Sequence, residues 1–419
     1  MQRIALFLLV LSLTLLNILV QPTKLSLPLD RKTTTLMKKI LLTFASLFCS
    51  TLLMAQDFSQ FKPLNDSLFL HQKAYVKGNK YQRDALLFVD MLADTHPYYI
   101  YKERRDSLFA AQKKLLKKCG ACKSDSVFAE LLIATLGDLH DKHTDIIDPA
   151  QLPRKQRAAQ QAAQQAAQQD SSSSEALMAH KNDLFHYAIV PEHGICYLQF
   201  NQCVDARTSG NAALPRWDLM LDEMFAQMKA QGIRRLVVDA QYNNGGSSML
   251  CDELLIRLCP LEKLKLFSTS LRFSRLMAAY NPRIAVARQS WEADGHIDEL
   301  YPLPMGAPGP DFVQPEVYDG QVVFVQSERT YSSAGMLMTL ARDNHLGLIV
   351  GEDSSFPPSH YGEILPYRLP HTGLLGTISC KFFGRPDGEH LEDKTLVPDV
   401  KLNLADKAKA WEEITRLFK

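Results

Sequence analysis

One serine lies where its hydroxyl could act as a nucleophile. Ser332 follows an apolar run typical of a buried strand and precedes a helical pattern, so it is expected at a helix N-terminus. Most serines in that position simply cap the helix. A serine held at a strand end with backbone N–H groups nearby can also attack a carbonyl carbon. Residues 330–335 therefore contain a candidate nucleophile.

A pair of glycines follows another predicted strand. Residues 235–239 form a short apolar run, and Gly245 and Gly246 lie in the turn after it. Paired glycines tolerate positive φ angles and leave their N–H groups bare. Such groups can stabilise the oxyanion that forms when a carbonyl is attacked. Taken alone, the pair is more often a plain tight turn.

A histidine near the end of a helical region supplies a candidate base. His143 lies in Asp141-Lys142-His143-Thr144, and the unperturbed pKa of histidine is close to working pH. A lone histidine is more often structural than catalytic, and His140 is a rival base. The two histidines could also suggest a metal site, but no nearby cysteine or carboxylate spacing completes a zinc motif, so we expect no metal and no cofactor.

Cys119 and Cys122 have the spacing of a redox pair, in the order Cys-Gly-Ala-Cys. A lysine-rich helical pattern precedes them, where a thioredoxin-like site would have a strand. The pattern favours a local disulfide or free thiols at a helix end over a thiol oxidoreductase, which remains a weaker alternative.

The elements that must position these residues fall into three regions. Residues 57–150 form a predicted N-terminal helical subdomain, with apolar side chains at helical spacing. Residues 151–180 are a low-complexity linker rich in alanine, glutamine and serine. Residues 184–419 alternate strand and helix, which predicts an α/β core with a partly parallel sheet. The strands are expected at 194–200, 235–239, 322–325 and 346–350, and the helices at 216–231 and about 333–343.

The N-terminus and the charge balance bear on where the protein acts. The 419 residues have a formal net charge of +1, which gives no reason to expect nucleic-acid binding. Residues 37–55 have the layout of a secretory signal peptide, with Gln56 as the first mature residue. A second apolar run precedes them, so we interpret residues 1–36 as a misassigned start and Met37 as the true one; the alternative is an uncleaved anchor. The mature chain is expected to be exported, periplasmic or secreted, with no membrane span.

The order of these segments resembles the tail-specific, or C-terminal processing, serine peptidase family, which includes the tricorn protease core and retinoid-binding relatives. Its DLR-x-N-x-GG turn is similar to residues 239–246, and its T-x-S-x-x-E segment to residues 330–335, with Gly335 in place of the glutamate. Further similarities are a GE-x-T turn at 351–354, an LP-x-S/T-G segment at 369–373, a GV-x-PD segment at 395–399 and a D-x-HT segment at 141–144. The resemblance covers residues 75–400, roughly, and leaves too little ordered chain for a PDZ domain.

The resemblance implies a ClpP/crotonase-like α/β peptidase core with an N-terminal helical subdomain, acting on a peptide or protein substrate. Some members use a Ser–Lys dyad, but residues 353–360 contain no lysine. The tricorn-like branch implies Ser332 as nucleophile, His143 as base and Glu392 in support. The oxyanion would be held by backbone N–H groups of Gly245 (or Gly246) and Ser333.

A catalytically silent family member is the main alternative, binding a peptide or an apolar ligand in the same cleft. A hydrogen bond between His143 and Ser332 would separate the two hypotheses, because a general base must lie within about 2.6–3.2 Å of the proton it removes.

Overall fold

The computed structural model describes residues 62–63, 77–148, 183–304 and 312–418. The predicted misassigned start (1–36), signal peptide (37–55) and low-complexity linker (151–180) lie outside the described residues. None of the described helices is long and apolar enough to cross a membrane.

A six-stranded sheet carries the segment with Ser332, in the strand order β12-β9-β8-β5-β4-β3. The strands are β3 (Phe185–Val190), β4 (Ile195–Phe200), β5 (Arg235–Asp239), β8 (Gln321–Gln326), β9 (Leu348–Gly351) and β12 (Val400–Lys401). All neighbours pair in parallel except β3, which is antiparallel to β4. This is the partly parallel α/β sheet that the sequence predicts.

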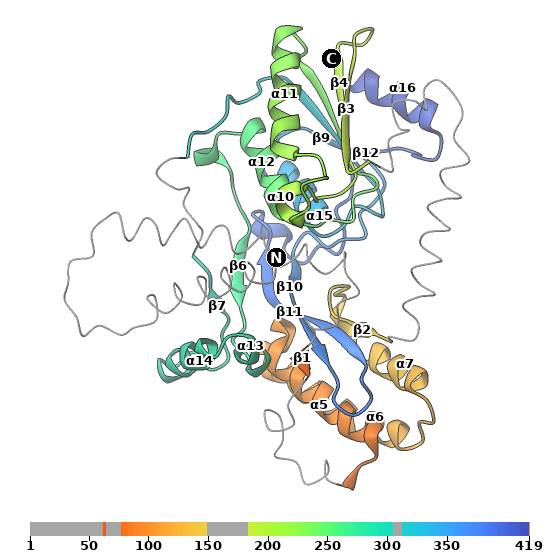
Figure 1. Cartoon of the computed structure of the whole chain (residues 1–419), viewed down its shortest axis with the longest axis vertical. Helices are drawn as coiled ribbons and strands as arrows, with labels where there is room; N and C mark the ends of the chain where they lie inside the picture. Colours follow the sequence, from red (N-terminus) through yellow and green to blue (C-terminus); the bar gives the residue numbers. More distant parts are fainter. Residues whose placement is uncertain (1–61, 64–76, 149–182, 305–311, 419) are drawn as a thin grey trace, which may run out of the picture.

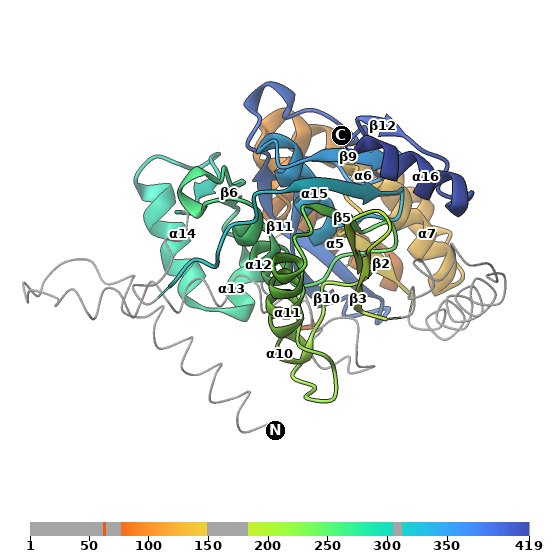
Figure 2. The ribbon, with the colours of Figure 1, turned by 90° about the horizontal axis from the view of Figure 1, so that it is seen from above.

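Helices cover both faces of this sheet, as Figures 1 and 2 show. On one face lie α11 (Trp217–Ala230), α12 (Ser248–Leu258) and α15 (Ser333–Asp343). On the other lies α16 (Lys407–Leu417), which packs Trp411 and Ile414 onto the sheet. Every residue of β4 is buried, which explains why all of its residues except Gln199 are apolar or aromatic and do not alternate with polar ones.

A second six-stranded sheet, which the sequence analysis did not predict, is built around a long hairpin. It contains β1 (Lys62–Pro63), β2 (Asp145–Ile147), β6 (Ser268–Leu271), β7 (Tyr301–Pro302), β10 (His360–Arg368) and β11 (Leu375–Gly384). The antiparallel strands β10 and β11 pair from His360 opposite Phe383 to Arg368 opposite Leu375.

The N-terminal helices pack against this second sheet. They are α5 (Lys80–Thr95), α6 (Lys102–Gly120) and α7 (Asp125–Thr135), and together with the hairpin they form a hydrophobic cluster of their own. A capping box starts α5: Asn79 accepts from the Gln82 N–H, and the Gln82 side chain accepts from the Asn79 N–H.

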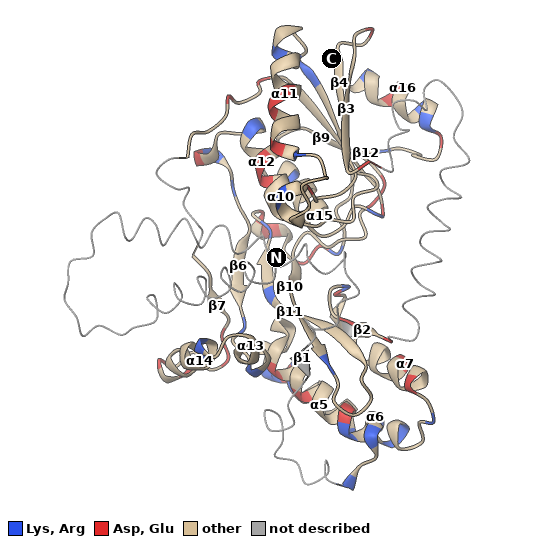
Figure 3. Cartoon of the chain, viewed as in Figure 1, with Lys and Arg blue, Asp and Glu red and all other residues tan. Residues whose placement is uncertain are grey.

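The remaining elements lie in connections, and all of them except α14 are short. They are η3 (Pro97–Ile100), η4 (Gly137–Leu139), α10 (Ala206–Ser209), η5 (Leu261–Lys263), α13 (Arg275–Tyr280), α14 (Arg283–Ala293) and η6 (Gly388–His390). Figure 3 shows basic and acidic residues interspersed along the helices, in keeping with the balanced net charge.

Candidate active site

Ser332 lies at the N-terminus of α15 in an unusual backbone conformation. Its φ is 52° and its ψ is −126°, a combination that a non-glycine residue adopts only at a cost of about 1–3 kcal/mol. Its hydroxyl caps no N–H group of the helix, in contrast to a true cap such as Ser274 on α13. The structure therefore offers no capping role that would explain the residue, and leaves the hydroxyl for chemistry.

His143 contacts the Ser332 hydroxyl through one ring nitrogen and a backbone carbonyl through the other. The distance from Nε2 to Ser332 Oγ is 3.2 Å, and Nδ1 lies 2.9 Å from the carbonyl oxygen of Tyr361. A carbonyl only accepts, so Nδ1 carries the proton and Nε2 keeps a lone pair directed at Oγ. This is the tautomer that a general base for Ser332 needs.

Asp141 is buried beside His143 and accepts hydrogen bonds on both carboxylate oxygens. The backbone N–H of His143 donates to Oδ1 at 2.9 Å, and the Thr144 hydroxyl donates to Oδ2 at 2.6 Å. Asp141 Oδ1 is also 3.4 Å from His143 Nδ1. Burial alone would raise the pKa of Asp141, but hydrogen bonds from His143 and His96 hold it well below its usual range, so the carboxylate stays ionised.

Aromatic rings surround the base. The rings of Tyr331 and Phe356 lie 5.1 Å and 6.0 Å from the His143 ring, measured between centroids. A Cβ on Gly335 would lie 2.3 Å from the Phe356 ring, so only glycine leaves room for Phe356 here. Gly335, which stands where the resembling family has a glutamate, therefore leaves room for the apolar ring of Phe356 beside His143.

His360 lies in the same aromatic cluster but is not a second base. Its ring stacks on Phe383 at a centroid distance of 5.0 Å, and burial lowers the pKa of His360 to about 3. The side chain is therefore neutral at physiological pH, and it adds no charge near His143.

The turn that bears the glycines is tied to the turn that bears Ser332. The Thr330 hydroxyl donates to the Ala240 carbonyl at 2.9 Å, and the Tyr331 N–H donates to the Asn243 carbonyl at 2.9 Å. The Ser333 hydroxyl donates to the Gly246 carbonyl at 2.8 Å. These bonds hold two segments that are far apart in sequence in one arrangement around the serine.

Of the three N–H groups expected to bind the oxyanion, the structure leaves two without an acceptor among the described residues. The Gly245 N–H already donates to Asn243 Oδ1 at 2.8 Å. Contrary to the expectation from the sequence, it is therefore not available to an oxyanion. Among the described residues, the N–H groups of Gly246 and Ser333 have no acceptor. These two remain as candidates, and Gly245 instead allows the close approach of the two turns.

We predict that Gly245→Ala lowers kcat by about 10²-fold, because a misplacement of the reacting groups by about 1 Å can cost that factor. A Cβ on Gly245 would lie 2.7 Å from Ser332 Cβ and 2.9 Å from the Tyr331 carbonyl oxygen, which would push the turns apart. Gly295→Ala is the matched control, because Gly295 has a similar φ, 98° against 94°, and open space around it. Equal kcat values for the two variants would contradict the prediction.

Glu392 does not take the supporting position that the resemblance implies. It is exposed, and within the described part of the chain no hydrogen bond joins it to His143. Its neighbour Asp393 is held by Arg385, which also binds Asp343 at the end of α15. Asp343, at the C-terminal end of α15, lies about 16 Å along the helix axis from Ser332. The segment that bears Glu392 is therefore anchored at the end of α15 opposite to Ser332. Tyr361 and Asp141 occupy the space around His143 Nδ1 instead.

The other candidates from the sequence lie elsewhere or lack the required chemistry. His140 is exposed, and its φ of 49° belongs to a turn. Cys119 and Cys122 are free thiols; burial raises the pKa of Cys119 to about 12, the opposite of what an attacking thiol requires. The described residues contain no group of three or more potential metal ligands.

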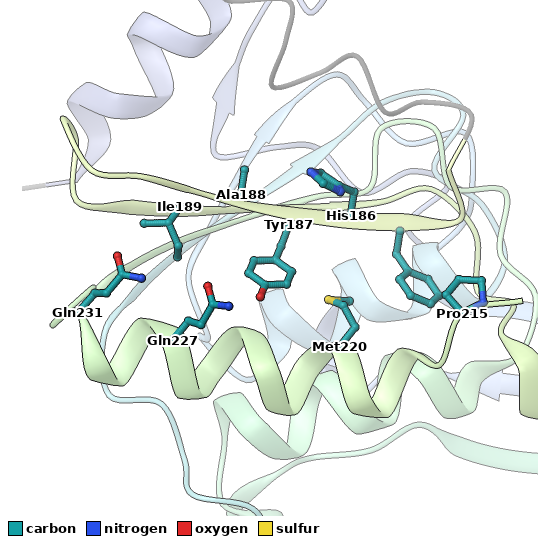
Figure 4. A pocket seen from close by; sticks show the side chains of 9 residues that line it. His186, Tyr187, Ala188, Ile189, Pro215, Met220, Gln227 and Gln231 are labelled. Atoms are coloured by element: carbon teal, nitrogen blue, oxygen red, sulfur yellow. The ribbon is translucent and has the colours of Figure 1, made fainter.

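A groove between β3 and α11 is separate from this site. Figure 4 shows it lined by Tyr187, Ile189, Met220 and Gln227, among others, and none of the residues around Ser332 contributes to it.

Comparison with known proteins places the chain in a family. Residues 194–402 match the profile of peptidase family S41. The chain belongs to this family and is a serine-type peptidase. The resemblance seen in the sequence is thereby confirmed at the level of the family. No curated protein matches the chain.

Solved structures share the fold at low sequence identity. Mature CPAF in complex with lactacystin has a TM-score of 0.56 at 12% identity, covering 81% of this chain and 98% of that one. A candidate peptidase from Parabacteroides merdae has a TM-score of 0.50 at 14% identity, covering 80% and 96%.

Proposed function

We propose that this chain is an exported peptidase in which Ser332 attacks the peptide carbonyl and His143 acts as general base. The observation that carries the proposal is the 3.2 Å contact between Ser332 Oγ and His143 Nε2, with Nδ1 held by the Tyr361 carbonyl. Export rests on the signal-peptide pattern of residues 37–55 alone.

The reaction would follow acyl-transfer chemistry. His143 Nε2 takes the Ser332 proton as Oγ bonds to the carbonyl carbon, and the Gly246 and Ser333 N–H groups stabilise the oxyanion. The imidazolium then gives this proton to the leaving amine, and the C–N bond breaks to leave an acyl-enzyme ester. Water, deprotonated by His143, hydrolyses the ester and restores the serine.

The same contact favours hydrolysis over the catalytically silent alternative. A protein that only bound a peptide or an apolar ligand would need neither a serine with positive φ nor a histidine of fixed tautomer directed at it. Both features cost stability or restrict sequence, and both are explained by an activated nucleophile.

Labelling with a fluorophosphonate tests the proposal directly, because the probe reacts only with an activated hydroxyl. We expect the folded wild-type protein to take up one probe, and fragmentation of the labelled peptide to place it on Ser332 rather than Ser333. A folded protein that takes up no probe, or takes it up at another residue, would exclude the mechanism.

A further inference from the structure

A second histidine lies behind the proposed base, paired with Asp141. His96 Nε2 is 3.0 Å from Asp141 Oδ2, and the exposed fractions of the two side chains are 0% and 2%. His96 comes from the junction of α5 and η3, and Asp141 from the turn after η4. The pair is therefore built from two segments of the N-terminal region and is closed off from solvent.

The contacts of His96 fix its tautomer. Its Nδ1 accepts the Tyr98 N–H at 3.1 Å, so the ring proton lies on Nε2 and is donated to Asp141. Arg272 Nη1 donates to the His96 carbonyl at 3.0 Å, and the Tyr361 ring lies 4.6 Å from the His96 ring. These contacts make His96 a hydrogen-bond donor of fixed orientation to Asp141.

With His96 included, Asp141 accepts three hydrogen bonds and keeps a further contact to the base. Two of its donors, Thr144 and His96, share Oδ2, while Oδ1 takes the His143 N–H and faces His143 Nδ1 at 3.4 Å. The carboxylate thus has one orientation, with one oxygen directed toward the ring that gains a charge during catalysis. Because both partners of Oδ2 are buried donors, rotation of the carboxylate would leave them unpaired.

We propose that Asp141 and His96 are positioning residues for catalysis: His96 holds the Asp141 carboxylate in place, and Asp141 stabilises the positive charge that His143 acquires. This inference rests on the proposed function and deepens it. The Tyr361 carbonyl fixes the tautomer of His143, while Asp141 supplies the negative charge that a carbonyl lacks. The supporting carboxylate thus lies two residues before the base, in place of Glu392.

Few other charges face His143. His360 is neutral, and Lys142 is exposed with its Nζ 5.7 Å from the centre of the Tyr331 ring. The ring of Tyr361 packs against His96; burial raises the pKa of Tyr361 to about 12, so it too is neutral. Among the described residues, Asp141 therefore carries the only carboxylate within 4 Å of a His143 ring nitrogen. Its removal should therefore alter the pH dependence of catalysis.

The test compares Asp141→Asn, His96→Phe and His96→Gln with Asp84→Asn. Asp84 is a matched control: it is also fully buried and accepts the His371 N–H, the Thr372 N–H and the Thr372 hydroxyl, but it has no contact with His143. Steady-state kinetics on a fluorogenic peptide would be measured across pH, with thermal unfolding of each variant recorded in parallel.

We expect Asp141→Asn to lower kcat by about 10²-fold with little change in KM, less than the loss in a triad where the aspartate also fixes the tautomer. The acid limb of kcat/KM should move to lower pH, because the imidazolium loses its neighbouring negative charge. His96→Phe should reproduce the loss in kcat. His96→Gln should restore most of it, since the Gln amide can donate to Asp141 from the position of Nε2.

A purely structural role gives a different pattern. If Asp141→Asn and His96→Phe lowered only the unfolding temperature, with kcat and the pH profile unchanged as in Asp84→Asn, the positioning role would be refuted. Fluorophosphonate mapping of the wild-type protein keeps the two proposals apart. Wild type labelled on Ser332 with an unaffected Asp141→Asn variant would overturn the positioning role alone, whereas unlabelled wild type would overturn both.

Discussion

Ser332→Ala is expected to lower kcat for peptide hydrolysis by about 10⁶-fold, and His143→Ala by a similar factor. The double variant should be no slower than either single one, because a nucleophile and its base act as a unit and each is useless without the other. The residual rate would reflect binding and the oxyanion donors. The measurement is kcat and KM of the three variants on one peptide substrate.

Ser274→Ala provides the control for this experiment. Ser274 begins α13 and its side chain accepts the Met277 N–H, so its loss should lower stability by about 1 kcal/mol and leave kcat unchanged. Ser332 caps nothing, so its alanine variant should lose activity without losing stability. Substantial activity in Ser332→Ala, or losses that add in the double variant, would show that another residue performs the attack.

The second large effect concerns stability. Asp343→Ala is expected to destabilise the fold by about 3–5 kcal/mol, because the buried Arg385 would keep only its more exposed partner, Asp393. Arg385 binds Asp343 through Nη2 at 2.5 Å and Nε at 3.1 Å, and the side chains are 4% and 1% exposed. Asp343 is the last residue of α15, where a negative charge is unfavourable unless a cation offsets it. Urea unfolding would measure the loss.

A double substitution separates the charge effect from packing. Asp343→Leu with Arg385→Met removes both charges and should recover most of the stability lost in Asp343→Ala, because no buried ion then lacks a partner. Glu316→Ala, which breaks the exposed Lys229 pair, should change stability little. An Asp343→Ala variant as stable as wild type would mean that water reaches Arg385 and replaces the lost carboxylate.

Local sequence patterns were sufficient for the sheet that carries Ser332. The expected strand 235–239 and the helix at about 333–343 coincide with β5 and α15. These elements are short apolar runs or helical stripes bounded by turn residues, so the signal is contained within each segment. The observed β9, Leu348–Gly351, starts two residues later than predicted because Leu346 bonds back to the end of α15.

The second sheet gave no comparable signal. Its central strand β10 contains Gly362 and Pro366, residues that disfavour a strand when read locally. Its partners come from positions as far apart as Lys62 and Gly384, so only the pairing itself defines it. The strand order of this sheet depends on contacts between segments that are far apart in the sequence, so it cannot be predicted from any one segment.

The candidate site was predictable only where residue type carries the chemistry. The sequence named Ser332 and His143, and the structure brings them within hydrogen-bonding distance. It could not name Tyr361, because a backbone carbonyl has no residue-type signature, nor His96, which is separated from Asp141 by 45 positions. Asp141 is part of the segment 141–144, but the sequence assigns it no role, because its contacts with His96 and His143 become visible only in the structure.

The serine and the histidine belong to different halves of the molecule. Ser332 precedes α15, which packs on the mostly parallel sheet. His143 is held by the Tyr361 carbonyl of β10, a strand of the hairpin that packs with the N-terminal helices. On the proposed mechanism, neither half has peptidase activity by itself, because both cores must form and pack together before His143 Nε2 comes within hydrogen-bonding distance of Ser332 Oγ.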